Sequence, residues 1–303
     1  MKLFQIKLLF EISTDCTLPE YKTMMFRGIF GNAYRKIVCR NFSERNCAKC
    51  FLAANCEFAA NFQNLNFYPE QVPPKYKKYT NFPPKFVFFV PDKSKKWQKG
   101  NKFLVYLTFF NYPKISLESL QTILKKLEEF WVDRKTQAKL IFDKVEDMSN
   151  NEVILTKDGI FRNTVNQIKL SYSKPASSQV KLHFVTPCRI INKNVRVKSD
   201  INEEILTRRM QERLRLLSLN TDDFYMPDWD VTHLKFIDRN IVYRDVKHKS
   251  YRQRRKLKLG GFTGSITISS EKVSFFHDLT VLSYMHIGSN TQGGYGKYNI
   301  EKV

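Results

Sequence analysis

The stretch "KFLVYLTFFNYPKISLESLQTILKKLEEFW" (102–131) places two different hydrophobic patterns side by side. Residues 102–110 form a short apolar run of aromatic and β-branched side chains, which is typical of a buried strand. Ser116 then precedes apolar residues that recur every three or four positions: Leu117, Leu120, Leu124, Leu127 and Trp131. Serine is a favoured helix N-cap, and this spacing predicts an amphipathic helix. The stretch therefore predicts a strand followed directly by a helix.

Similar elements flank this unit in the first half of the chain. The expected elements are a strand at 2–12, a helix from Pro19 to about Arg40, a strand at 85–90 and strand-like segments at 152–156 and 167–172. The resulting order, β-α-β-β-α-β, is that of a ferredoxin-like (RRM-like) unit. The first half therefore predicts one α+β domain of this class.

The second half of the chain repeats the same order of patterns. The expected elements are strands at 180–190, near 232–244 and 256–269, and at 296–303, with helices at 201–219 and 273–286. The segment "SKPASSQ" (173–179) has the composition of a linker. We therefore expect tandem ferredoxin-like domains at 1–176 and 177–303. The first domain would carry a cysteine-containing insertion at about 39–82, and the second a C-terminal glycine-rich loop.

The charge balance indicates the class of partner. The 303 residues include 51 Lys and Arg against 29 Asp and Glu, for a formal net charge of +22. Such an excess favours a polyanionic partner, with nucleic acid first and an anionic membrane surface second. No apolar run approaches the roughly 18 residues of a membrane-spanning helix. We expect a cytoplasmic protein whose six cysteines are reduced thiols or metal ligands.

The densest basic stretch is "RDVKHKSYRQRRKLK" (244–258), which contains a single acidic residue. Arginine forks and lysines bind phosphates, and an aromatic ring such as that of Tyr251 can stack on an unpaired base. The alternative is a solvated loop without a specific partner. We predict that this stretch contacts nucleic acid through Arg244, Lys249, Arg252, Gln253, Arg254, Arg255 and Lys256.

Four cysteines lie close together in "CRNFSERNCAKCFLAANC" (39–56): Cys39, Cys47, Cys50 and Cys56. One pair has the C-x2-C spacing with which a tight turn can offer two thiolates to one metal ion. The other spacings fit no standard zinc finger closely. The sequence leaves two interpretations open, a structural metal site or four unrelated thiols. For a metal site, zinc is favoured over an iron–sulfur centre.

The glycine-rich segment "HIGSNTQGGYGK" (286–297) lies close to the end of the sequence. It is no P-loop, because Gly294 stands where that motif requires lysine, and too few residues follow for a dinucleotide-binding βαβ unit. Glycines still admit positive φ and let backbone N–H groups approach a phosphate. We therefore expect Gly288, Gly293, Gly294, Gly296 and Lys297 to contact a nucleic-acid backbone.

All five histidines lie in the second half of the chain. His286, at the end of a predicted helix, is either a cap for the last carbonyls or a general acid or base beside a bound phosphodiester. His248 lies in the basic stretch, where it could contact phosphate or take part in catalysis. His183 is expected in or near the core. No group of carboxylates indicates a metal-dependent nuclease, and RNA carries its own nucleophile, the 2′-hydroxyl.

Taken together, these motifs resemble the CRISPR precursor-RNA (repeat) processing endoribonucleases of the RAMP superfamily, in the subgroup with an N-terminal cysteine cluster. The matching stretches are "FRGIFGNAYRKIVC" (26–39), "CAKCFLAANCEF" (47–58), "FPPKFVF" (82–88), "FVTPCRI" (184–190), "LTRRMQERLRLLSL" (206–219), "SYRQRRKLKLGGFTGSITI" (250–268) and "HIGSNTQGGYGKY" (286–298). They keep their order over nearly the whole chain. The last two are the most specific.

The resemblance implies metal-independent cleavage of repeat RNA by 2′-hydroxyl attack, with no catalytic cofactor, and a product guide that stays available to other CRISPR effector-complex subunits. Many members of the family place a catalytic histidine in the first domain, and this chain has no histidine in residues 1–182. The resemblance then leaves as the general base either His286, or one of the two tyrosines Tyr21 and Tyr34 with the assistance of Arg27 or Arg35. The alternative is a non-catalytic RAMP-type subunit that holds guide RNA.

Overall fold

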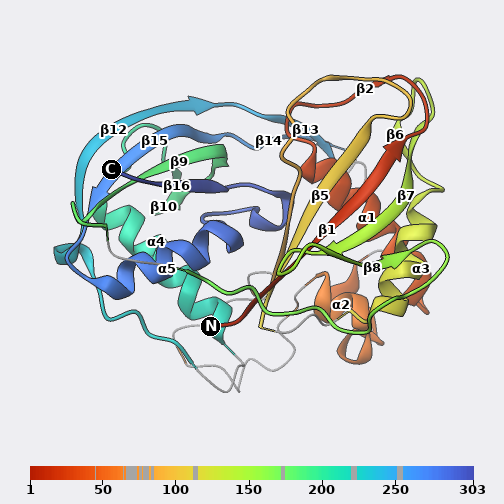
Figure 1. Ribbon diagram of the computed structural model, residues 1–303, viewed down its shortest axis with the longest axis horizontal. Coiled ribbons are helices and arrows are strands. Elements are labelled where there is room, and N and C mark those ends of the chain that lie inside the picture. The colour runs from red at the N-terminus through yellow and green to blue at the C-terminus, as the bar shows by residue number, and fades with distance from the viewer. Residues whose placement is uncertain are drawn as a thin grey trace. The chain divides into compact units, whose positions relative to one another are not determined.

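The computed structural model describes the chain except for residues 45, 64, 66–73, 75–76, 78–81, 83–84, 112–114, 172–174, 220–223 and 251–254, and it describes 247–250 and 255–258 as backbone only. The described chain divides into two compact units, residues 2–168 and residues 169–303 together with Met1. Figure 1 shows an antiparallel sheet and its helices in each unit. Among the described residues, no helix combines the length and the apolar character that crossing a membrane requires.

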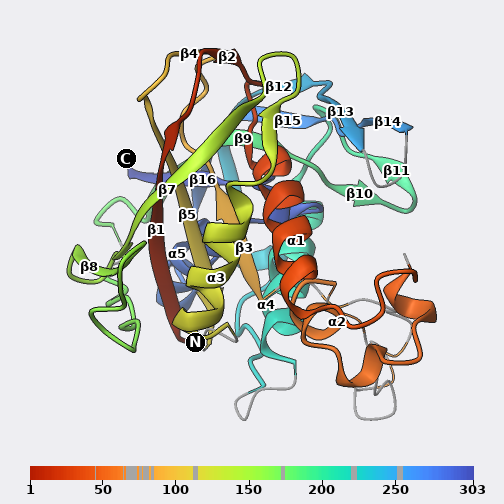
Figure 2. The same cartoon turned by 90° about the vertical axis from the view of Figure 1, so that its right-hand side faces the viewer.

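The N-terminal unit is built on a sheet with the strand order β3-β5-β1-β7-β6, and β8 also pairs with β7. Its strands are β1 (Leu3–Ile12), β3 (Phe86–Phe89), β5 (Lys102–Phe110), β6 (Trp131–Asp133), β7 (Ala138–Asp147) and β8 (Glu152–Thr156). Its long helices are α1 (Thr23–Val38) and α3 (Leu117–Leu127), which Figure 2 shows together over one face of the sheet. β1 lies between β5 and β7. These are the third and fourth strands of the β-α-β-β-α-β order, so the arrangement is that of a ferredoxin-like unit.

The fourth strand of this unit differs from the prediction. It is β7, which pairs with β1, whereas 152–156 form β8 on the other side of β7. Among the described residues 167–171, only Gln167 forms a β-bridge, and its partner is Phe4. The predicted helix also ends earlier, at Leu127, and Trp131 begins β6 with 49% of its surface exposed. Turn residues after Leu127 end the helix, so the spacing of Trp131 was a coincidence.

Phenylalanines fill the core between α1 and the N-terminal sheet. Phe26 and Phe30 of α1 are fully buried, and their ring centroids lie 5.3 and 5.0 Å from that of Phe88. Phe26 also packs edge-on against Phe10 of β1, at 5.6 Å. Burying one such ring contributes about 1.5–3 kcal/mol, and tilted or edge-on ring pairs at these distances are favourable. The spacing of these residues along α1 therefore fixes which face of the helix meets the sheet.

The C-terminal unit repeats this architecture with the strand order β12-β15-β9-β16. Its strands are β9 (Gln179–Cys188), β12 (Lys235–Arg244), β15 (Gly261–Ser269) and β16 (Tyr298–Lys302), and its helices are α4 (Glu203–Ser218) and α5 (Val273–Met285). Asn202 caps α4 by accepting a hydrogen bond from the Ile205 N–H. Both helices lie on the same side of the sheet (Figure 1). The prediction of tandem ferredoxin-like folds is confirmed.

Smaller elements surround these two sheets. The helix α2 (Glu57–Asn61) and the strand pair β2 (Cys16–Thr17) and β4 (Lys96–Trp97) belong to the N-terminal unit. In the C-terminal unit, β10 (Ile191–Asn192) and β11 (Val195–Arg196) form a short hairpin after β9. A second pair, β13 (Lys247–Ser250) and β14 (Arg255–Lys258), continues from the ends of β12 and β15. Figure 2 shows this second pair beyond the end of the sheet. We call the pair, with its connecting residues, the basic arm (247–258).

Candidate nucleic-acid interface

The glycine-rich loop (286–297) is tied to the end of β9 by backbone hydrogen bonds. The Ser289 N–H donates to the Arg189 carbonyl at 2.7 Å, and the Gly296 N–H donates to the Pro187 carbonyl at 3.0 Å. Within the loop, the Ile287 N–H donates to the Gly296 carbonyl at 3.2 Å. The loop therefore lies directly against the strand, with no room for inserted side chains.

Two glycines are required by this close approach. Gly288 has φ +85°, and a Cβ atom there would lie 2.5 Å from the Arg189 carbonyl oxygen. Gly296 has φ +73°, and its Cβ would lie 1.8 Å from the Ile287 carbonyl oxygen. Both positions combine the left-handed region with backbone contact, so any L side chain would be strained. The packing of the chain on itself thus accounts for these glycines.

The N–H groups of Gly293, Gly294 and Gly296 all donate hydrogen bonds to backbone carbonyls of this chain. Gly293 donates to the Asn290 carbonyl and Gly294 to the Thr291 carbonyl, both at 2.9 Å, and Gly296 donates to Pro187. All three glycines are buried, whereas Gly288 is partly exposed. The contact of these glycines with RNA stays a prediction. The arrangement favours a supporting role for the buried part of the loop.

His286 ends α5 and lies inside this loop, with 1% of its surface exposed. Its backbone has φ 59° and ψ 162°, a combination that residues other than glycine rarely adopt. Burial, followed by the positive charges of Lys297 and Arg213, holds the pKa of His286 well below its usual value, although hydrogen bonds with the backbone of Tyr295 and Thr291 act in the opposite direction. The imidazole is therefore neutral and enclosed. Its role as general acid or base stays a prediction.

Two cations hold the carboxyl end of α5. Arg213 Nη2 donates to the Met285 carbonyl at 2.9 Å, and Lys297 Nζ donates to the Ser283 carbonyl at 2.8 Å. Burial lowers the pKa of Arg213 to about 9 and that of Lys297 to about 8. Positive charge is favourable at this end of the helix dipole. Lys297, predicted to contact RNA, thus has a structural contact in this conformation.

Tyr34 is fully buried in α1. Its hydroxyl donates to Glu57 Oε1 at 2.6 Å and accepts from Asn61 Nδ2 at 3.4 Å, so it joins α1 to α2. Burial and the hydrogen bond to Glu57 raise the pKa of Tyr34 well above its usual value. To act as a general base, which accepts a proton from the substrate, the Tyr34 hydroxyl would first have to lose its own proton near neutral pH. The environment of Tyr34 therefore works against the role of general base that the resemblance left open for it.

The two arginines of α1 pack against aromatic rings of the residues that follow it. The Arg27 guanidinium lies 4.6 Å from the Phe62 ring centroid, and that of Arg35 lies 5.0 Å from the Phe42 centroid. Arg35 also donates to the carbonyls of Phe42 and Glu44. Both side chains are half-buried. Their contact with RNA stays a prediction.

The cysteine cluster does not form a ligand set among the described residues. No three His, Cys, Asp or Glu side chains in the described part of the chain come together as metal ligands. Cys47 and Cys56 pack against the hydrophobic core, and Cys50 Sγ accepts from Asn41 Nδ2 at 3.6 Å. The described residues thus show the four thiols without a preformed ligand set, and the two interpretations of the cluster stay open. Zinc binding by these thiols stays a prediction, which metal analysis of the wild type and of Cys47→Ser would test.

The basic arm brings cationic residues from both of its strands to opposed positions. In its register Lys247 stands opposite Lys258, Lys249 opposite Lys256, and Ser250 opposite Arg255. His248 of β13 stands opposite Leu257. At the base of the arm Arg244 is exposed, and its Nε donates to Thr263 Oγ1 at 3.2 Å. Arg252, Gln253 and Arg254 lie outside the described residues.

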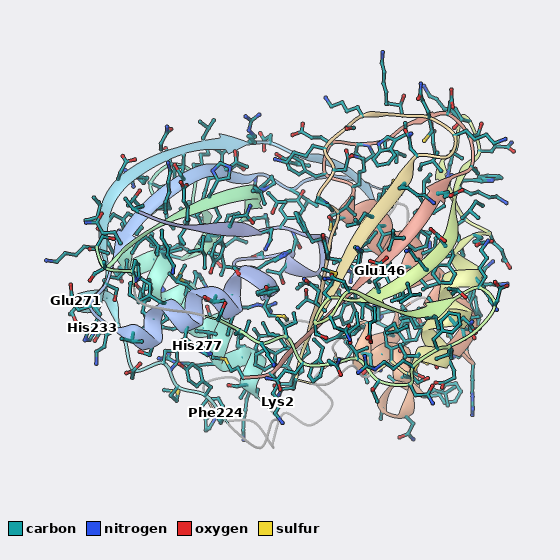
Figure 3. All side chains as sticks on the ribbon, in the orientation of Figure 1. Lys2, Glu146, Phe224, His233, Glu271 and His277 are labelled. Atoms are coloured by element: carbon teal, nitrogen blue, oxygen red, sulfur yellow. The ribbon has the colours of Figure 1, made fainter. Side chains whose placement is uncertain are left out.

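The remaining histidines are His183, His233 and His277, and all three lie outside the glycine-rich loop. His233 Nδ1 is 2.9 Å from Asp230 Oδ1, and His277 Nδ1 is 3.3 Å from Asp278 Oδ1; both histidines are labelled in Figure 3. His183, expected in or near the core, is exposed on β9. That expectation was wrong because alternate residues of β9 face away from the helices.

Two family models match the chain in succession. A model described as an N-terminal domain matches residues 1–170, and the model of the CRISPR-associated endoribonuclease Cas6 matches residues 182–298. The second match includes the basic arm and the glycine-rich loop. Residues 182–298 of this chain thus match the Cas6 family. The resemblance to the CRISPR-associated endoribonucleases is therefore confirmed for this region.

Solved Cas6 structures share the fold at low sequence identity. A chain of a partial Cas6-RT-Cas1–Cas2 complex is 10% identical, with a TM-score of 0.59 over 100% of this chain and 46% of that chain. A Cas6 product complex of Thermus thermophilus is 13% identical, with a TM-score of 0.54 over 99% of this chain and 100% of that one. A further CRISPR-associated Cas6 protein is 9% identical, with a TM-score of 0.51 and 99% of each chain covered.

These likenesses show the fold. This chain corresponds to only 46% and 29% of the length of the matched chains in the two Cas6-RT-Cas1–Cas2 complexes. A comparison with curated proteins gave no match.

Proposed function

We propose that this chain is an endoribonuclease that binds the repeat RNA of precursor CRISPR transcripts in the cytoplasm and cuts it to give mature guide RNAs. The observation that carries this proposal is the Cas6 match at 182–298, because this region holds the loop and the basic arm. The net charge of +22 supports a polyanionic substrate. Other CRISPR effector-complex subunits are the proposed further partners.

The proposed reaction needs no metal ion, because the substrate itself supplies the nucleophile. A base removes the proton of the 2′-hydroxyl, and this oxygen attacks the neighbouring phosphorus. The bond to the 5′-oxygen breaks, and an acid protonates the leaving oxygen. The products are a 2′,3′-cyclic phosphate and a 5′-hydroxyl. Cations around the phosphodiester stabilise the charge that develops in the transition state.

His248 is the proposed proton-transfer residue. Tyr34 and His286 are enclosed within their units, and the shifts of their pKa values oppose proton exchange near neutral pH. His248 belongs to β13 of the basic arm, among residues suited to hold a phosphodiester. Arg244, Lys249, Arg255 and Lys256 of the same region would contribute positive charge to the binding of the RNA.

A second candidate function is that of a non-catalytic subunit that holds guide RNA. The enclosure of Tyr34 and His286 favours it, because two of the three candidate catalytic side chains then have structural roles. This candidate and the enzyme share the same RNA-binding surface, so only a cleavage assay separates them.

The test is cleavage of the repeat RNA in the presence of EDTA. We expect the wild type to cut, His248→Ala to lose at least about a hundredfold in rate, and the matched His233→Ala control to retain activity. A 2′-deoxy nucleotide at the cut site should block cleavage and leave binding intact. Binding without cleavage by the wild type would establish the RNA-holding subunit. Full activity of His248→Ala would rule out the assignment of His248.

A further inference from the structure

Three cationic residues of the C-terminal unit gather around Tyr243, near the end of β12. Arg196 Nη1 of β11 donates to the Tyr243 hydroxyl at 2.9 Å. Lys198 Nζ lies 5.9 Å from the centroid of the Tyr243 ring. Arg189 interacts electrostatically with both Arg196 and Tyr243. The three cations come from one segment, 189–198, which contains no acidic residue.

Glycines hold this cluster in place. A Cβ atom on Gly260 would lie 2.1 Å from the Tyr243 hydroxyl oxygen, so the tyrosine can adopt its position only beside a glycine. Gly288 allows the glycine-rich loop to approach Arg189, whose carbonyl accepts from the Ser289 N–H at 2.7 Å. The loop thus supports the backbone from which the Arg189 side chain extends.

The positive charge of this cluster is poorly neutralised. Asp245 Oδ1 lies 4.0 Å from Arg196 Nη1, and its carboxylate is 59% exposed. Arg189 Nε is buried and has no hydrogen-bond partner among the described residues. Burial, and then the neighbouring Arg196, lower the pKa of Arg189, whereas Tyr243 and Tyr295 act in the opposite direction. Like charges held together in this way are stabilised when an anion binds between them.

We propose that Arg189, Arg196 and Lys198 form a binding site for a backbone phosphate of the RNA. Planar guanidinium groups bind phosphate oxygens through paired hydrogen bonds, and the exposed Lys198 adds a point charge. Tyr243 positions Arg196 through its hydroxyl. The inference rests on the proposed function for the identity of the RNA. It assigns to the glycine-rich loop the role of supporting arginines that bind phosphate.

The test measures the affinity of the full chain for two RNAs of equal length, a repeat RNA with a 2′-deoxy nucleotide at the cut site and an unrelated sequence. We expect Arg196→Ala and Arg189→Ala each to weaken binding of both RNAs by about tenfold or more, because hydrogen bonds to charged groups contribute at this level. Arg196→Lys should restore part of the loss. Lys235→Ala, which removes an exposed cation of β12, is the matched control.

A phosphate contact has two further signatures. The plot of log affinity against log salt has a negative slope, and in Arg196→Ala this slope should become less negative by about 0.7, the value for one phosphate of a single strand. In a scan with single neutral methylphosphonates, one position should weaken binding to the wild type and have no effect on Arg196→Ala.

Three outcomes would overturn this inference. Unchanged affinity in Arg196→Ala and Arg189→Ala excludes the site, and losses no larger than that of Lys235→Ala reduce it to general charge. Failure of the wild type to bind either RNA overturns the site together with the proposed function. Binding of both RNAs with equal affinity and no cleavage of an unmodified repeat RNA contradicts the proposed function alone, because the phosphate site does not depend on sequence.

Discussion

His286 carries backbone strain at the edge of a glycine-rich loop. Its φ of 59° and ψ of 162° belong to a region that glycine occupies readily, yet the chain has a bulky side chain there. The imidazole fills a buried position beside the cations that hold the end of α5. The packing of the buried imidazole thus offsets the backbone strain at residue 286. A glycine at this position would have neither the strain nor the packing.

The first prediction separates these two effects at residue 286. We expect His286→Ala to lower the free energy of unfolding by about 2 kcal/mol or more, because it keeps the unfavourable φ and leaves a cavity. His286→Gly should be about 1 kcal/mol more stable than His286→Ala. Urea denaturation measures both, with the exposed His183→Ala as the control. An alanine variant as stable as the glycine variant would show that the strain is absent.

The second prediction concerns the charge of Lys297. Burial lowers its pKa from 10.5 to about 8, so between these two values the unfolded chain binds more protons than the folded chain. Stability therefore rises with pH across this range. We expect the difference in unfolding free energy between the wild type and Lys297→Met to shift in favour of the wild type from about pH 8 to about pH 10.5. A constant difference would place the ammonium group in water.

At the scale of the elements, glycines with different surroundings have different roles. Gly288 has φ +85° and approaches the backbone of Arg189, whereas Gly28 lies in α1 with open space where a Cβ would be. The first is required by the contact between the loop and β9. Gly28 lowers the stability of α1, and no close packing contact at this position requires a glycine.

The third prediction uses this pair. We expect Gly28→Ala to raise the free energy of unfolding by up to about 1 kcal/mol, since alanine is the better helix former. Gly288→Ala should lower it by about 1–3 kcal/mol through backbone strain. Thermal and urea denaturation of the two single variants give the comparison. Equal effects of the two substitutions would contradict the packing described for the loop.

At the scale of the whole molecule, the excess of positive charge sets the conditions under which the chain binds RNA. A net charge of +22 favours association with any polyanion at low salt. The fourth prediction is a linear fall of log affinity with log salt, with a slope of about −0.7 for each phosphate contacted. Filter binding between about 50 and 200 mM salt gives this slope, and a flat line would mean that phosphates contribute little.

The order of strands and helices could be predicted from the sequence in most of the molecule. The helix after Ser116, the strand at 102–110 and the main strands and helices of the second unit follow from apolar spacing, because burial on one face imposes a period on each element. One missed element is β7, in which Glu146 forms ion pairs with Lys144 of the same strand and with Lys7 of the neighbouring β1. Because these charged residues interrupt the apolar pattern of β7, the hydrophobic spacing alone did not predict this strand.

The candidate site was predictable as a set of motifs but not as an arrangement. The sequence by itself determined the tandem fold, the excess of basic residues and the presence of a glycine-rich loop, because these depend on residue types and their local spacing. Only the tertiary structure decided that His286 and Tyr34 are enclosed and that Arg189, Arg196 and Lys198 meet around Tyr243. Burial and proximity arise when segments distant in the chain pack together, and no local pattern records which side chains then share a space.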